Sequence, residues 1–209
     1  MQKRANYVRA LGALFALWGA DYPAAYEGAQ AAAVDGLAAP APPSAAVRRR
    51  LEDEVLTLGA LAATLPVESL YKPWASMSGG DGGGPAQFGA ARNLLLGDSA
   101  QHMRALYDGL ELEVPPAYEA MPDHVVLLTE VACLYAEAGN GEAVRALLAD
   151  HLDWLSAYEE ALAIRLAALK ARPLPVARHH DELTAALAHG RELAGTLARA
   201  IHNLSQSLR

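Results

Sequence analysis

Apolar side chains recur every three or four residues along most of the chain. In one stretch they stand at Val47, Leu51, Val55, Leu58, Ala62 and Leu65, and in another at Leu183, Leu187, Gly190, Ala194, Leu197, Ile201, Leu204 and Leu208. This spacing places one apolar stripe along a helix. We find no segment with the period-two alternation of a half-buried strand, and no internal repeat. The pattern predicts an all-α protein.

Prolines, glycines and capping residues divide the pattern into separate helices. We predict helices over residues 2–19, 23–37, 44–65, 86–96, 98–109, 122–139, 142–151, 152–172 and from about 176 onward. Between them we expect a proline-bearing linker at 38–43, a flexible glycine-rich loop at 76–85 and a further loop at 110–121. The prediction is a single domain spanning residues 1–209, a bundle of roughly nine helices.

The best-defined helix start lies at Pro122, Asp123 and His124, ahead of a long apolar run. Proline at the first helical position and an acid at the second are typical of a helix N-terminus, where a carboxylate meets the positive end of the helix dipole. His124 has Leu127 and Leu128 three and four residues further on, so it shares a face with apolar side chains. We therefore expect its imidazole to stay neutral.

Charge and cysteine content narrow the class of protein. The formal net charge of −7 disfavours a nucleic-acid binder and favours a basic partner. The single cysteine, Cys133, lies within an apolar helical run, so no intrachain disulfide can form, which fits a reducing compartment. Lys3 and Arg4 precede an apolar stretch, but its helical spacing favours a core helix over a signal peptide. No stretch approaches the ~20 apolar residues of a membrane span.

The sequence gives little support for a metal site or for acid–base catalysis. His179, His180 and Asp181 are adjacent, yet they lack the spacing of metal ligands, so we expect a solvated helix start and predict neither metal nor cofactor. Asp123 and Glu130 are seven residues apart, about 10 Å of helical rise, which is loose for shared acid–base work. An enzyme that uses Asp123, His124 and Glu130 remains the least favoured alternative.

Tyr71 and Trp74 sit in a proline-stiffened segment beside the glycine-rich loop. Rings in such a place can either line a binding groove or fill the core. The residues themselves do not decide between these two interpretations.

Four sequence elements, taken in order, resemble the TorD/DmsD/NarJ family of molybdoenzyme maturation chaperones. They are Ser69-Leu70-Tyr71-Lys72-Pro73-Trp74, then Gly97-Asp98-Ser99-Ala100 with Met103 and Leu106-Tyr107, then Pro122-Asp123-His124-Val125, and finally His151-Leu152 with Trp154. The Pro-Asp-His element is the most specific of them. The sequence departs from the family in the helix after it, where Leu128 stands at a position that is often glutamate.

The resemblance implies an all-helical cytoplasmic chaperone, without enzymatic activity, that binds the twin-arginine signal peptide of a molybdopterin oxidoreductase and assists cofactor insertion before export. The residues that match family positions for peptide recognition are Tyr71, Pro122, Asp123 and His124, and the secondary candidates are Trp74, Asp98 and Glu130. Asp123 could accept from an arginine guanidinium, or Asp123 and His124 could only hold the preceding loop against the helix. Both a monomer and a homodimer are compatible with such a chaperone. A helical adaptor that dimerises through the last helix is the alternative from another class.

Overall fold

The computed structural model describes residues 1–16, 21–57, 64–72 and 95–208, and this part of the chain is helical. Its α-helices are α1 (Gln2–Ala13), α2 (Tyr22–Ala31), α3 (Ala45–Arg50), α4 (Asp98–Gly109), α5 (Val125–Glu137), α6 (Gly141–His151), α7 (Leu155–Ala171) and α8 (Ala177–Gln206). Three short elements complete it, the π-helix η1 (Leu51–Leu56) and the 3₁₀ turns η2 (Glu68–Leu70) and η4 (Pro116–Tyr118).

The predicted all-α class is confirmed, whereas the predicted helix count is not. Within the described ranges there are seven α-helices of ten residues or more, together with the six-residue α3, instead of roughly nine. None of the described helices is long and apolar enough to cross a bilayer. The predicted loop at 76–85, most of the predicted helix at 86–96, and Trp74 lie outside the described residues.

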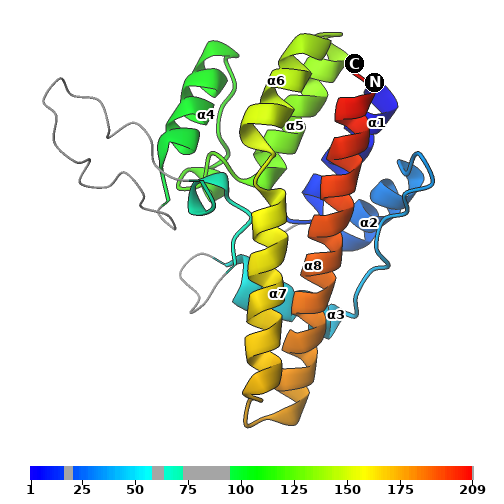
Figure 1. Ribbon diagram of the computed structural model, residues 1–209, viewed down its shortest axis with the longest axis vertical. Helices are drawn as coiled ribbons and strands as arrows, with labels where there is room; N and C mark the ends of the chain where they lie inside the picture. The colour runs from blue at the N-terminus through cyan, green and yellow to red at the C-terminus, as the bar shows by residue number, and fades with distance from the viewer. Residues whose placement is uncertain (17–20, 58–63, 73–94, 209) are drawn as a thin grey trace, which may run out of the picture.

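The long helix α8 organises the molecule. It forms an antiparallel hairpin with α7 along the long axis, and α1, α3 and α6 also contact it (Figure 1). The predicted apolar stripe of α8 faces this core, since Leu187, Leu197 and Leu204 are fully buried within the chain. The stripe therefore serves intramolecular packing, as the core interpretation of the last helix expected. Helix α4 stands at one edge and packs mainly on η2.

The helix after Ser44 is shorter than its pattern predicts. Ser44 is its N-cap as expected, since its hydroxyl accepts from the amide of Val47 at 3.3 Å. The helix then widens into η1 and ends at Leu56 instead of Leu65, because Thr57 adopts an extended backbone with φ −86° and ψ 129°. The Thr57 hydroxyl donates to the carbonyl of Glu52 at 2.5 Å, in place of a further helical amide. Periodicity alone cannot detect such a side-chain stop.

Three other helix boundaries also move inward. Helix α1 ends at Ala13 and α2 at Ala31, where residues 19 and 37 were predicted. After α2 the chain turns through Asp35 and Gly36, which both have positive φ. Helix α7 begins at Leu155, three residues later than predicted. In the described parts of these predicted helix ends, residues 14–16, 32–37 and 152–154, the chain forms turns or irregular backbone instead of helix.

Candidate functional site

Two segments far apart in sequence meet at the start of α5. The amide of Val125 donates to the carbonyl of Pro66 at 2.9 Å, and the amide of Glu68 donates to the carbonyl of Asp123 at 3.2 Å. These two bonds form a strand-like pairing between the residues before α5 and those around η2. The pairing brings two of the four sequence elements of the family resemblance into direct contact.

Asp123 is the polar centre of this junction and is fully buried. One carboxylate oxygen, Oδ2, accepts from the amide of Ser69 at 2.6 Å and also from the Ser69 hydroxyl. Among the described residues the other oxygen, Oδ1, has no hydrogen-bond partner. Burial raises the pKa of Asp123, and the nearby Glu68 adds to that rise, while the bonds from Ser69 oppose it. The carboxyl group is a structural anchor in this arrangement, without exposed surface for a ligand.

His124 is the N-cap of α5, which corrects the predicted helix start. The imidazole Nδ1 accepts from the amide of Val126 at 3.3 Å, so α5 begins at Val125, and Pro122 and Asp123 lie before the helix instead of in its first turn. Burial lowers the pKa of His124 to about 3. The ring of Tyr118 packs against the imidazole, with the two ring centroids 4.9 Å apart. The expected neutral imidazole therefore has a physical basis in complete burial.

A second polar chain ties η2 to α4 and α6. Glu68 is fully buried, and its Oε2 lies 2.7 Å from Nδ1 of His151. Nε2 of His151 lies in turn 2.8 Å from Nδ1 of His102 on α4, an exposed residue. On the other side of Glu68, the ammonium of Lys72 lies 2.9 Å from Oε1. Sequence reasoning missed Glu68 and His102, because no spacing rule joins residues that are 49 and 83 positions from His151.

Tyr71 is partly exposed, and its ring packs against the core. Its ring stacks on Trp154, with centroids 5.3 Å apart and an interplanar angle of 8°, and meets Tyr158 edge-on at 5.6 Å. Its hydroxyl donates to the carbonyl of Leu65 at 3.0 Å, and burial raises its pKa. Of the two interpretations left open for this ring, the contacts favour core filling.

The remaining predicted site residues are distributed unevenly. Pro122 is buried, and its carbonyl accepts from the hydroxyl of Tyr107 on α4 at 2.7 Å. Asp98 is the first residue of α4 and partly exposed, and Gly97 is the cap. Glu130 does not join the junction, since it points toward α1, where its carboxylate lies 3.6 Å from Arg9. The structure therefore places Pro122 and the two residues after it at the junction, puts Tyr71 directly after η2 with its ring on Trp154, and leaves Glu130 apart.

A surface groove of about 540 Å³ lies beside this junction, between α4 and the segment that leads to α5. Tyr107, which bonds to Pro122, forms part of its wall. The groove is lined by Arg104, Tyr107, Asp108, Leu112, Glu113, Val114, Pro116 and Glu119. Carboxylates and apolar side chains alternate on this lining. Its one cation, Arg104, donates to the carbonyl of Glu119 at 2.9 Å.

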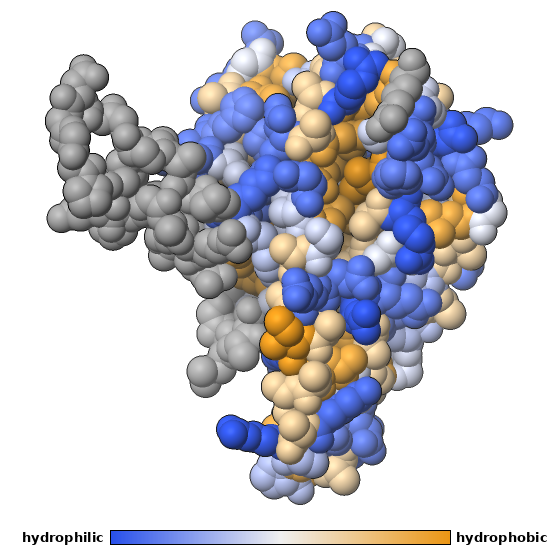
Figure 2. Space-filling model, in the orientation of Figure 1, coloured by the Kyte–Doolittle hydropathy of each residue, from blue (hydrophilic) through white to orange (hydrophobic). Residues whose placement is uncertain are grey.

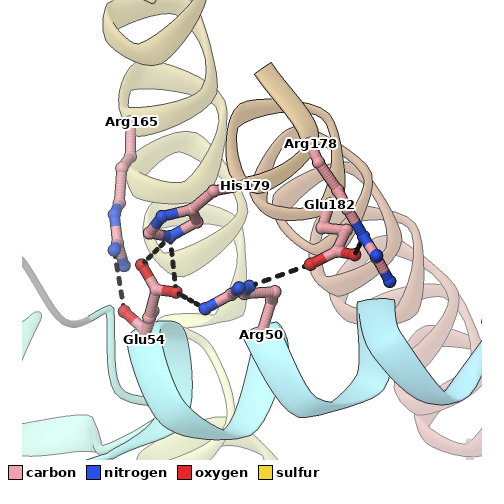
Figure 3. Close-up of polar contacts among 6 residues, drawn as sticks. All are labelled: Arg50, Glu54, Arg165, Arg178, His179 and Glu182. Atoms are coloured by element: carbon pink, nitrogen blue, oxygen red, sulfur yellow. Dashed lines mark hydrogen bonds and ion pairs between the residues drawn. The ribbon is translucent and has the colours of Figure 1, made fainter. Parts of the chain in front are cut away.

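The histidine–acid cluster near the start of α8 has a structural role (Figure 3). Nε2 of His179 lies 2.8 Å from Glu54, while Glu182 pairs with Arg178 and with Arg50 at 2.8 and 3.1 Å. These bonds join α8 to α3 and η1. Across the described ranges, no group of three or more histidine, cysteine, aspartate or glutamate side chains could hold a metal ion.

Two of the three consecutive arginines of α3, residues 48–50, pair with acids one helical turn further on. Arg48 and Arg50 pair with Glu52 and Glu54 at 2.9 and 3.0 Å. Arg48 is nevertheless buried, and its guanidinium lies 3.3 Å from the centre of the Tyr22 ring. This arginine therefore belongs to the core between α2 and α3.

Comparison with known proteins finds no matching family model, no matching curated protein and no matching solved structure. The site is thus defined by its own geometry. It consists of a buried polar junction at the start of α5, next to a carboxylate-lined surface groove.

Proposed function

We propose that this chain is a cytoplasmic maturation chaperone of the TorD/DmsD/NarJ type. It would bind the twin-arginine signal peptide of a partner molybdopterin oxidoreductase and assist cofactor insertion before export. The observation that carries the proposal is the acidic groove, which adjoins the Pro122, Asp123 and His124 element through Tyr107.

The charges around the groove suit an arginine pair. Residues 108–119 contain four acids, Asp108, Glu111, Glu113 and Glu119, and no lysine or arginine. A guanidinium group forms its strongest hydrogen bonds with carboxylates, and two arginines in sequence need at least two such partners. The net charge of −7 adds long-range attraction for a basic leader.

The groove also offers apolar surface. Leu110 and Leu112 are 38% and 37% exposed, and Leu112 lies on the lining with Val114 and Pro116. A signal peptide carries an apolar region after its basic residues. The groove therefore presents the two kinds of surface, acidic and apolar, that such a peptide requires.

Asp123 and His124 act indirectly in this proposal. Both are fully buried, so neither offers surface to a peptide in this conformation. Asp123 holds the chain before α5 against η2, and the adjacent Pro122 carbonyl holds Tyr107 in the groove wall. We assign them the role of positioning residues for the groove.

A titration with a fluorescently labelled synthetic twin-arginine leader peptide tests the proposal. We expect binding, and at least tenfold weaker binding of a leader in which both arginines are replaced by lysine, because lysine cannot form the bidentate bond. The double variant Glu113→Gln/Glu119→Gln should weaken binding about tenfold or more. Glu160→Gln serves as the control, since Glu160 is exposed on α7, away from the groove lining.

Two results would reject the proposal. One is the absence of leader binding by the folded wild-type chain. The other is equal loss of affinity in the groove variant and in the Glu160→Gln control, which would indicate non-specific charge attraction.

A further inference from the structure

The turn that joins α7 to α8 has a composition unlike the rest of the chain. We call residues 170–178 the hairpin tip. Its sequence, Lys-Ala-Arg-Pro-Leu-Pro-Val-Ala-Arg, holds three cations, no acid and otherwise only apolar residues, in a chain whose net charge is −7. The tip therefore concentrates positive charge and apolar side chains in nine consecutive positions.

The residues of the hairpin tip are exposed except Leu174, which is partly buried and packs against the core. Val176 is 61% exposed, whereas every other exposed large hydrophobic residue except Ile164 lies between 36% and 38%. Lys170 and Arg172 are exposed, and their side chains form no hydrogen bond or ion pair with the described residues. The side chain of Arg178 is 84% exposed, although it pairs with Glu182. The hairpin tip thus presents two cations that are unpaired within the described residues, Lys170 and Arg172, beside the exposed apolar side chain of Val176.

The hairpin tip projects from the body of the molecule (Figure 1). It caps a 17-residue helix and a 30-residue helix, and it lies at the end of the long axis opposite the two termini. At this end Figure 2 shows apolar residues along the hairpin with hydrophilic residues projecting beside them. A projecting apex can enter a deformable surface.

We propose that the hairpin tip docks the protein peripherally on an anionic lipid surface. Val176 enters the headgroup layer, and Lys170, Arg172 and Arg178 meet lipid phosphates. Apolar residues flanked by lysine and arginine are the arrangement that interfacial anchors use, and each cation adds to the attraction within a Debye length of the membrane.

The acidic remainder of the chain does not oppose this orientation strongly. Of the acids next in sequence to the tip, Glu182 is paired with Arg178 and Arg50, and Asp181 has no such partner among the described residues. Charges further than about 8 Å from the membrane are largely screened at physiological ionic strength. The acidic groove beside α4 lies toward the opposite end of the long axis, so docking leaves it accessible.

Co-sedimentation of the wild-type chain with lipid vesicles is the first test. We expect it to bind vesicles of equimolar phosphatidylglycerol and phosphatidylcholine, to ignore vesicles of phosphatidylcholine alone, and to dissociate as salt is raised. Absence of binding to the anionic vesicles overturns the proposal. The assay contains no leader peptide, so its outcome is independent of the proposed chaperone function.

Matched variants then locate the contact. Lys170→Glu should weaken vesicle binding about tenfold, and Val176→Asp by a similar factor. Lys3→Glu makes the same charge change at another exposed lysine, whose side chain forms no hydrogen bond or ion pair with the described residues. Ile164→Ser removes an equally exposed apolar residue from the middle of α7, so both variants should bind like the wild type. Equal loss in Lys3→Glu, or full binding by Val176→Asp, overturns the docking proposal and indicates simple ion exchange.

Discussion

The carboxylate of Asp123 and the serine Ser69, 54 positions apart in the chain, are joined by two hydrogen bonds to one oxygen atom. One comes from the backbone amide and the other from the hydroxyl of Ser69. Because this contact is fully buried, it fixes the segment before α5 against η2. The sequence pattern placed Asp123 at a helix N-terminus, but in the structure its carboxylate holds the segment before α5 to η2.

Asp123→Ala should lower the free energy of unfolding by about 2–4 kcal/mol, because it leaves the buried donors of Ser69 unpaired. Asp123→Asn should cost clearly less, since the amide oxygen can accept the same bonds and the group cannot ionise. Urea unfolding of the two variants measures the difference. Equal stability of Asp123→Ala and the wild type would show that the bonds do not form in solution.

His124 should make stability depend on pH. Burial lowers the pKa of His124 from 6.5 to about 3, so between these values the unfolded chain binds a proton that the folded chain does not. Stability contributed by the neutral ring is present above pH 6.5 and is lost as pH falls, by about 1.4 kcal/mol per unit. Urea unfolding at pH 5 and pH 7 measures this slope. His124→Asn keeps a capping acceptor but cannot titrate. Its unfolding free energy should therefore change less with pH, by the contribution of about one proton.

The crossing of α1 over α5 should tolerate no side chain at Gly12. A Cβ atom built there would lie 2.0 Å from Oγ1 and 2.9 Å from Cβ of Thr129, which is itself buried. Gly12→Ala should therefore lower the free energy of unfolding by about 2–3 kcal/mol, since the two helices must move apart. Thermal unfolding followed by circular dichroism would reveal the loss.

Gly28→Ala is the matched control for this variant. Gly28 lies inside α2 and a Cβ atom there would meet nothing within 4 Å. Alanine should stabilise the chain by about 0.5–1 kcal/mol, because it restricts the unfolded state without a clash. Destabilisation by both variants would point to a general intolerance of alanine instead of a close helix crossing.

Tyr71 should contribute to stability chiefly through its ring. Tyr71→Ala removes the stack on Trp154 and should cost about 2–4 kcal/mol. Tyr71→Phe keeps the stack and loses only the bond to the carbonyl of Leu65, at about 0.5–1.5 kcal/mol. Chemical unfolding distinguishes the two. A similar cost for both would mean that the hydroxyl, and not the stack, holds this segment.

The sequence predicted those features that depend on local chemistry. The apolar stripe of α8, the Ser44 cap and the stop at Gly139 follow from periodicity and capping rules, and the structure has all three. The early end of the helix after Ser44 could not be predicted, because it depends on the Thr57 hydroxyl and a π-helical turn.

The candidate site was predictable only in part. Asp123 and His124 were recognised as unusual, but their partners were not, because Ser69 and Tyr118 reach them through the tertiary fold. The groove was missed because Glu113 and Glu119 lie in a loop without periodicity, while Asp108 lies in the last turn of α4. A run of four acids without a cation, in residues 108–119, was the available signal.

The packing of α8 also bears on the order in which the chain can fold during synthesis. This helix is made after α1 to α7, yet it covers apolar faces of α1, α3, α6 and α7 along its 30 residues, about 45 Å. Until it leaves the ribosome, those faces have no intramolecular cover. The core can therefore close only after α8 has been made, and a chain interrupted before α8 would expose its apolar surface to aggregation.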